Sequence, residues 1–254
     1  MGIDKKATLL DMLILRADLD CTLLQHTASV CKLIPEIRDM IGFEQNNPHH
    51  HLDVWQHTVM AINNASIDLI IRLTMLFHDI AKPRCYTEDE NGGHFYGHPQ
   101  INSNMAKEIL LRLGHDGGTI ETVAQLVLYH DVDIQPRRKH IKRWIYKIGE
   151  ERFRQLIQVK RADAMAQSET YHHSKLSALD AVLSMFGDIT DQQLRFSVKN
   201  LAINGRDLIN VGVPQGVKIG SILNHLMDMV TDSIVENERE RLLAIASKFI
   251  CEQE

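Results

Sequence analysis

Two adjacent polar residues, His78 and Asp79, lie within an otherwise apolar stretch of the sequence, LIIRLTMLFHDIAKP. The stretch runs from Leu69 to Pro83 and is predicted to form a buried helix. Burying an imidazole and a carboxylate is unfavourable unless a partner compensates them. A divalent metal ion is such a partner, because its ligands are ionised oxygens and neutral nitrogens. An internally hydrogen-bonded polar pair in the core is the alternative.

Further residues of the same types recur at positions predicted to face inward. In chain order the set is His57, His78-Asp79, His98, His130 and Asp163. They come from five predicted helices or helix starts, and a helical bundle can bring such side chains to one point. Imidazoles and carboxylates without thiolates favour Mn, Fe, Ni, Co, Mg or Zn in a site of nitrogen and oxygen ligands. Whether one or two ions bind stays open.

The segments that position these residues are predicted to be helices. His57 is predicted one turn into a helix that begins at Asp53, with Gln56 three residues on, which is a capping-box pattern. The helix that carries His78 and Asp79 is expected to end at Pro83, because proline is not tolerated in a helix interior. The turn signal Asn91-Gly92-Gly93 predicts one short hairpin just after it.

The later candidates lie on helices as well. His98 precedes Pro99, a residue that suits the first turn of a helix. His130 continues the apolar stripe of the next predicted helix and should point inward, where a satisfied core histidine is the alternative. Asp163 falls in a helical region expected from about residue 140 to 167. The run at residues 49–51, HHH, is interpreted as polar surface near the cleft rather than a ligand set.

The predicted class is therefore all-α: a helical bundle with one short β-hairpin and a small helical tail. We expect N-terminal helices at 1–48, a metal-binding domain at 49–170 and a helical region at 171–254. Two amphipathic helices, at about 218–231 and 236–250, are expected to close the chain.

Composition narrows the function classes only modestly. The chain has 254 residues, 44% of them hydrophobic, and a net charge of −5, so a sizeable core is available and no nucleic-acid partner is forced. The four cysteines have no CxxC spacing, which favours a reducing compartment. No signal peptide and no uncharged apolar run long enough to span a membrane is recognised. We therefore expect a cytoplasmic protein without a membrane partner; its oligomeric state stays open.

The order His, His-Asp, Asp resembles that of the HD superfamily of metal-dependent phosphohydrolases. The likeness extends to the segments DVWQHT, LFHDIAKP, GHFYGHPQ, LVLYHD and RADAMAQ. The chain is similar in particular to the HD and body region of bacterial CCA-adding tRNA nucleotidyltransferases, over roughly residues 18 to 250. The Gly-Ser motif and paired aspartates of the nucleotidyltransferase head of those enzymes are not recognised, so tRNA tailing is not expected.

The resemblance implies a role for each candidate. It implies that His57, His78, Asp79 and Asp163 hold a first metal, and that His98 and His130 occupy the extra positions of two-metal HD proteins. For His98 the alternative is a surface residue at a helix start. Lys82, three residues after Asp79, could neutralise a substrate phosphate; a solvated lysine before proline is the alternative.

Other basic residues are weaker candidates. Arg84 and Arg161 could also face a substrate phosphate. One basic cluster could contact a nucleic-acid backbone, although a solvated helix start explains it as well; its members are Arg137, Arg138, Lys139, Lys142 and Arg143.

The leading hypothesis is a metal-dependent phosphohydrolase of the HD type, a phosphatase or 2′,3′-cyclic phosphodiesterase acting on a nucleotide or nucleic-acid phosphate. The alternative is a tRNA-, RNA- or partner-binding helical module related to the CCA-adding enzyme body, with a structural or vestigial metal site. A subunit that works with a separately encoded nucleotidyltransferase is a third possibility.

Overall fold

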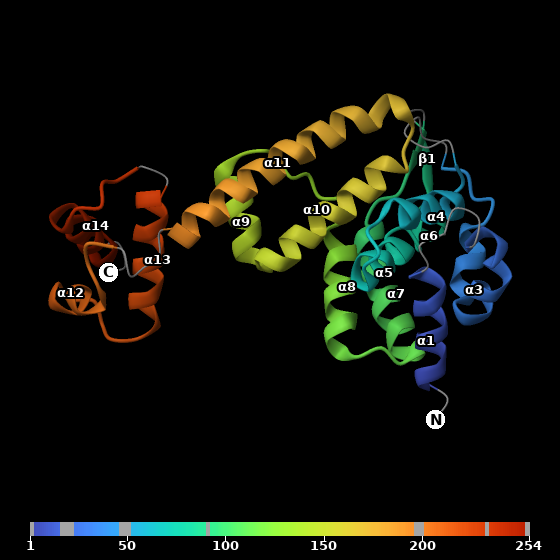
Figure 1. Ribbon diagram of the computed structural model, residues 1–254, viewed down its shortest axis with the longest axis horizontal. Helices are drawn as coiled ribbons and strands as arrows, with labels where there is room; N and C mark the ends of the chain where they lie inside the picture. The colour runs from blue at the N-terminus through green and yellow to red at the C-terminus, as the bar shows by residue number, and fades with distance from the viewer. Residues whose placement is uncertain are drawn as a thin grey trace. The chain divides into compact units, whose positions relative to one another are not determined.

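Figure 1 shows the computed structural model of the chain. The structure describes residues 3–15, 23–45, 52–89, 92–195, 201–231 and 234–251. The chain divides into two compact units, Met1–Leu183 and Ser184–Glu254. The finer division at residues 48 and 170 stays a prediction, and the histidine run at 49–51 lies outside the described residues.

The first unit is helical, as predicted, with a single short hairpin in its described part. In chain order its elements are α1 (Ile3–Ile14), α3 (Thr27–Leu33), the 3-10 helix η1 (Pro35–Met40), α4 (Val54–Asn64), α5 (Leu69–Phe77), α6 (Lys82–Cys85), β1 (Thr87–Asp89), β2 (Gly92–His94), α7 (His98–Leu113), α8 (Gly117–Tyr129), α9 (Arg138–Ile148), α10 (Glu150–Met165) and the greater part of α11 (Glu169–Arg195).

Helix α5 forms the centre of this unit. It contacts α1, α4, α7, α8 and α10, and α7 and α8 lie side by side beyond it (Figure 1). Every residue from Ile71 to Phe77 is buried. The one charged member, Arg72, is compensated because its guanidinium donates to the backbone carbonyls of Ile14, Ala65 and Ser66. A nearly all-apolar helix is thus covered on all sides, as its sequence demands.

The chain leaves α5 earlier than its sequence suggested. The helix ends at Phe77 rather than at Pro83, residues 78–81 form a turn, and Pro83 lies in the first turn of the short helix α6. Proline is tolerated there because the first backbone N–H groups of a helix have no intrahelical acceptor. His78 and Asp79 therefore lie on a turn at the end of a buried helix, where both side chains can reach the same side.

The region expected to be helical from about 140 to 167 is helical, but it is divided into two helices, α9 and α10, which meet at Gly149. Gly149 has φ of +86°, a left-handed value that glycine adopts at little cost. The hairpin prediction is confirmed: β1 pairs antiparallel with β2, with Thr87 opposite His94.

The second unit has a core of its own, which includes Leu208, Leu226 and Leu242. Its helices are α12 (Gly205–Asn210), α13 (Val217–Thr231) and α14 (Arg239–Cys251). The last two confirm the pair of closing amphipathic helices. A capping box between Asn204 and Asp207 begins α12.

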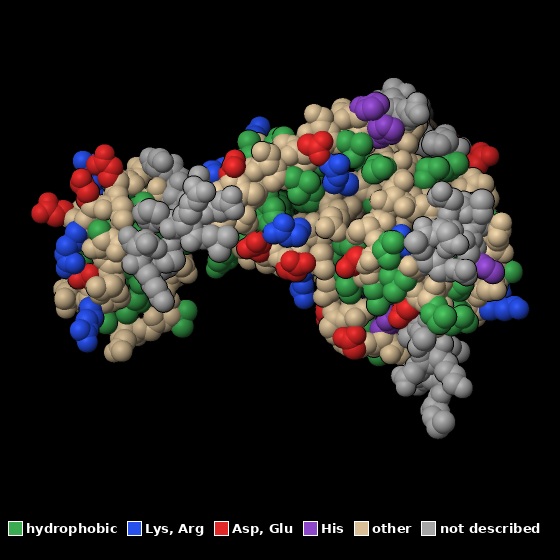
Figure 2. Space-filling model, viewed as in Figure 1, with side chains coloured by type: hydrophobic (Ala, Val, Ile, Leu, Met, Phe, Trp, Pro, Cys, Tyr) green, Lys and Arg blue, Asp and Glu red, His purple; other side chains and the backbone are tan. Residues whose placement is uncertain are grey.

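Surface charge is mixed in sign. On the face of the first unit drawn in Figure 2, acidic and basic side chains lie interspersed among apolar ones. None of the helices in the described part of the chain combines the length and the apolar character needed to cross a membrane.

Candidate metal centre

Four buried histidines share one arrangement. In each ring Nδ1 faces a backbone carbonyl oxygen: that of Ala166 for His57 at 3.2 Å, and, at 2.7 Å, those of Met75 for His78, Phe95 for His98 and Val127 for His130. A carbonyl accepts only, so each Nδ1 carries a proton and donates to it, and each Nε2 is the ring atom left to face the carboxylates or a metal ion. The contact with the carbonyl holds each ring in one direction, as a metal-ligating histidine needs.

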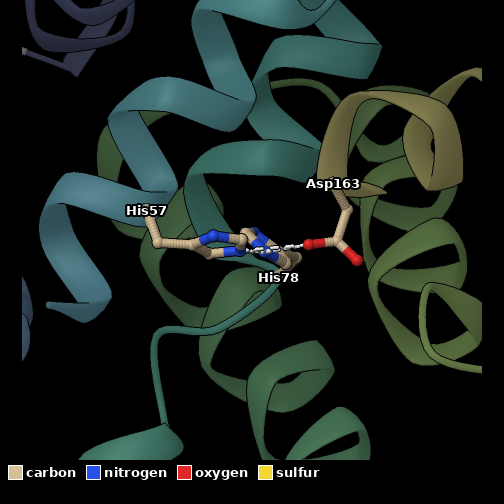
Figure 3. A group of neighbouring side chains, drawn as sticks. All are labelled: His57, His78 and Asp163. Atoms are coloured by element: carbon tan, nitrogen blue, oxygen red, sulfur yellow. Dashed lines mark hydrogen bonds and ion pairs between the residues drawn. The ribbon is translucent and has the colours of Figure 1, made fainter. Parts of the chain in front are cut away.

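The first group comprises His57, His78 and Asp163, whose candidate ligand atoms all lie within 4.8 Å of one another. His57 comes from α4, His78 from the turn after α5, and Asp163 from α10; the three side chains point toward one another in Figure 3. Asp163 Oδ1 lies 3.0 Å from His57 Nε2 and 3.6 Å from His78 Nε2.

The second group comprises Asp79, His98 and His130, again with ligand atoms within 4.8 Å of one another. Asp79 Oδ1 lies 3.7 Å from His98 Nε2 and 3.8 Å from His130 Nε2. Its other oxygen, Oδ2, lies 3.2 Å from His78 Nε2 and 3.6 Å from His57 Nε2. The Asp79 carboxylate therefore stands between the two groups and faces both.

The surroundings of the Asp79 carboxylate show whether a metal ion suits this site. The residue is only 1% exposed, and neither oxygen accepts a hydrogen bond of ordinary geometry from the described residues. The Lys82 ammonium, 2.8 Å from Oδ2, compensates part of this buried charge, whereas Oδ1 faces the imidazoles of His98 and His130 at 3.7 and 3.8 Å. Four Nε2 atoms directed at the two carboxylates form a donor set that suits a divalent ion. The residues present thus fit one or two metal ions.

The charges of the groups are strongly coupled. Burial disfavours ionised Asp79, but the charges of His78 and Lys82 outweigh it and hold the pKa of Asp79 well below its ordinary value. The pKa of Asp163 is likewise well below normal: burial opposes ionisation, and hydrogen bonds from His57 and His78 outweigh it. Both carboxylates are therefore anionic at neutral pH, as metal ligands must be.

Two of the imidazoles respond in opposite directions. Burial opposes protonation of His78, yet the adjacent charge of Asp79 raises its pKa to about 10. Burial, helped by the charge of His78, lowers the pKa of His130 to about 3, so that ring is neutral. His78 therefore carries a positive charge at neutral pH, and this charge compensates the two anionic carboxylates beside it.

A cavity of about 530 Å³ opens over the centre. Asp79, His98, His130 and Asp163 line it, whereas His57 lies behind the wall, fully buried. Lys82 also lines the cavity; it is only 7% exposed, which departs from a solvated lysine before proline. Its Nζ lies 2.8 Å from Asp79 Oδ2 and donates to Gln45 Oε1 at 2.7 Å.

Besides Gln45, the sequence reasoning missed three polar residues around the centre. Gln167 donates to Asp163 Oδ2 at 3.2 Å, and Lys175, which lines the cavity, donates to Gln167 Oε1 at 2.6 Å. Asn102 of α7 is fully buried; it accepts from Ala81 N–H at 2.6 Å and donates to the carbonyl of His78. The sequence did hold a signal for Asn102: asparagine is unfavourable inside a helix, so an asparagine on an apolar helix face indicates a specific hydrogen bond.

The weaker candidates lie away from the cavity wall. Arg84 is half exposed and pairs with Asp39 at 3.2 Å, and Arg161 pairs with Asp180. Neither is among the residues that line the cavity. The basic cluster is the N-terminal part of α9 with its cap, Arg137, and it also lies outside the lining.

Comparison with known proteins then identifies the family. The sequence profile of tRNA nucleotidyltransferase domain 2 matches residues 95–246, more than half of the chain. The chain belongs to this family. The match begins after His57, His78 and Asp79, and it includes His98, His130 and Asp163.

Two curated relatives extend the similarity toward the N-terminus. The A-adding tRNA nucleotidyltransferase of Deinococcus radiodurans is 26% identical over 203 residues, 77% of this chain and 46% of that protein. The CC-adding tRNA nucleotidyltransferase of Thermus thermophilus is 24% identical over 233 residues, 89% of this chain and 51% of that protein. The chain thus spans about half the length of the curated relatives it matches.

Proposed function

We propose that the protein is a metal-dependent phosphohydrolase of the HD type, a phosphatase or 2′,3′-cyclic phosphodiesterase. One observation carries the proposal: a buried, anionic Asp79 carboxylate faces two groups of imidazoles at the floor of an open cavity. A site made only to stabilise the fold needs no cavity over it. Phosphate esters suit this cavity because a divalent ion and a lysine beside it both attract phosphoryl oxygens.

The roles divide between the metal and the chain. When bound, the divalent ion polarises the phosphoryl group and lowers the pKa of water for its attack. His57, His78 and Asp163 would hold one ion, and His98 and His130 a second, with Asp79 between them. The backbone carbonyls that contact the histidine Nδ1 atoms keep each ring in place throughout the reaction.

Lys82 would bind and orient the substrate. Its ammonium is held by Gln45 and Asp79, so it presents a positioned charge in the cavity rather than a mobile one. Lys175 provides a second cation on the same cavity wall. Two lysines and the metal would together offset the charge that develops on the phosphoryl oxygens in the transition state.

The experiment is phosphate release by the purified full chain. It would be assayed with 3′-AMP, 2′,3′-cyclic AMP and a generic phosphate ester, each with Mn, Ni, Co and Mg. We expect turnover with at least one metal, and a loss of 100-fold or more in Asp79→Asn and His78→Ala. Glu121→Gln, an exposed residue on α8, is the matched control. Absence of turnover with every metal would refute the proposal.

A second candidate is binding of tRNA or another RNA, which the names of the relatives favour for this chain. Helix α9 buries Ile141, Trp144 and Ile148 and exposes Arg137 at its cap, Lys139 and Arg143. Exposed cations on one short helix suit a phosphate backbone, and such binding weakens steeply with salt. The triple variant R137Q/K139Q/R143Q should reduce both the affinity for tRNA and its salt dependence. Equal affinity of the variant and the native chain at low salt would exclude this surface.

A further inference from the structure

Three consecutive aromatic residues line the cavity: His94, the last residue of β2, and Phe95 and Tyr96, which follow it. Phe95 is anchored inward, with its ring centroid 5.5 Å from that of Tyr86 and 5.3 Å from Lys82 Nζ. Tyr96 is the opposite case, since 76% of it is exposed. A single exposed tyrosine is ordinary on a protein surface, but this one belongs to the wall of the candidate catalytic cavity.

Tyr96 is backed by a second ring. It stacks on His94, with 5.2 Å between centroids and 14° between planes. His94 Nε2 in turn lies 2.9 Å from Oδ1 of Asp89, on the paired strand. Offset parallel stacking of this kind is a favourable arrangement of aromatic rings. The tyrosine ring is therefore supported from one side, while most of the residue still meets solvent.

Hydrogen bonds connect the segment that carries Tyr96 to His98, a candidate metal ligand. The carbonyl of Phe95 accepts from both the backbone N–H and Nδ1 of His98, at 3.2 and 2.7 Å. Gly97, with φ of +76°, makes the tight turn between Tyr96 and His98. The bonds that orient a candidate metal ligand thus also fix the turn that carries Tyr96.

The hairpin packs closely against Tyr86 and the segment that carries Gln45. A Cβ atom at Gly93 would lie 2.6 Å from Tyr86 Cε2 and 2.7 Å from the carbonyl oxygen of Gln45. The strand is therefore packed as closely as a glycine allows against the segment whose Gln45 side chain holds Lys82. Gly93 of the hairpin and the Lys82 ammonium therefore both lie against Gln45.

We propose that the Tyr96 ring, supported by His94, is the stacking surface for the substrate's nucleobase, so that the cavity selects nucleotides over phosphate esters without a base. This rests on the proposed function and names its substrate class. Every base has a π-face, so stacking recognises a nucleotide without fixing its sequence. The phosphate lies over the metal groups and Lys82, and the base over Tyr96 at the rim.

The turnover test compares two substrates that differ in having a base, 3′-AMP and glycerol 2-phosphate. Tyr96→Ala should raise KM for 3′-AMP by roughly ten-fold or more with kcat nearly unchanged, and leave glycerol 2-phosphate unaffected. Tyr96→Phe should behave like the native chain because it keeps the ring. Tyr146→Ala is the matched control, since that tyrosine is 95% exposed on α9 and outside the cavity. An equal effect of Tyr96→Ala on both substrates would overturn the proposal.

A binding test separates this proposal from the proposed function. Adenosine has no phosphate, so its contact with the protein can be followed by saturation-transfer NMR without catalysis. Adenosine binding that is kept in Tyr96→Phe and lost in Tyr96→Ala supports the stacking surface, even if no phosphate ester is hydrolysed. Suppose instead that both substrates are hydrolysed and that the native chain and Tyr96→Ala bind adenosine equally. That result would refute the stacking surface but would still support the phosphohydrolase.

Discussion

Lys82 Nζ lies 2.8 Å from Asp79 Oδ2 at the floor of the cavity. The two residues are three positions apart, on either side of the point where the chain turns from α5 into α6. A buried ammonium this close to a candidate metal ligand lowers the negative charge that the carboxylate offers to a metal. The proposed function gives the same ammonium a second role, the binding of a substrate anion above the centre.

Replacing Lys82 by methionine should separate these two roles. We expect kcat/KM for 3′-AMP to fall by about 100-fold, because a positioned charge at the phosphoryl group is lost, while metal content stays the same or rises. Phosphate-release kinetics and elemental analysis measure the two quantities. Arg84→Met, two residues on but exposed and outside the cavity, is the control. Loss of metal in Lys82→Met would contradict the assignment.

The two ligand groups should behave as separate metal positions. His57→Gln removes a ligand of the first group, and His130→Gln removes one of the second. If each group holds an ion, each variant should lose about one equivalent of metal relative to the native chain. Elemental analysis after dialysis against a limiting metal gives the ratio. Complete loss of metal in both variants would instead indicate one shared ion.

Asn102 should matter although it is not a candidate ligand. Its side chain bonds both the carbonyl of His78 and the N–H of Ala81, and so holds the turn that carries Asp79. Asn102→Ala leaves two buried backbone groups without that partner, so we expect a loss of about 1–3 kcal/mol in the free energy of unfolding. Metal affinity should fall by about ten-fold or more.

Urea unfolding and metal titration measure these two effects. Asn104→Ala, an exposed asparagine on the same helix, is the matched control. A variant at Asn102 that loses stability but binds metal as tightly as the native chain would show that the turn does not need this residue to hold its ligands.

The sequence predicted the architecture better than it predicted the turns. The apolar stripes, the Asp53 cap and the Gly-rich hairpin signal are local, and each is confirmed by the structure. The end of α5 at Phe77 is not local. It depends on Asn102, which reaches the turn from another helix and satisfies backbone groups that would otherwise favour continuing the helix.

The candidate site follows the same division. Pattern alone selected residues that the fold brings together, because buried histidines and aspartates in apolar helices have few other uses. Gln45, Gln167 and Lys175 could not be found in this way. They are polar residues of common types in segments without a strong period, and only the tertiary fold shows what they contact. Arg84 and Arg161, the weaker candidates for a substrate phosphate, each pair with an aspartate outside the cavity lining.

The ion pair between Glu36 and Arg112 predicts how stability depends on pH. The guanidinium of Arg112, on α7, makes two hydrogen bonds to the Glu36 carboxylate of η1, at 2.8 and 2.9 Å. These bonds, aided by the charge of Arg112, lower the pKa of Glu36 although partial burial opposes the shift. A depressed pKa stabilises the fold above the ordinary glutamate pKa, and that contribution disappears as the pH falls through the lowered value.

Glu36→Gln should therefore lower the melting temperature at pH 7 by about 1–3 °C, a small effect because Arg112 is about half exposed. The difference from the native chain should shrink as the pH falls below about 4, where Glu36 of the unfolded chain becomes protonated. Thermal unfolding at pH 3 to 7 measures this difference. Glu121→Gln, which removes a more exposed ion pair with Lys107, should give a smaller effect at pH 7. A difference for Glu36→Gln that stays constant across this range would show that the Glu36 carboxylate is not linked to folding.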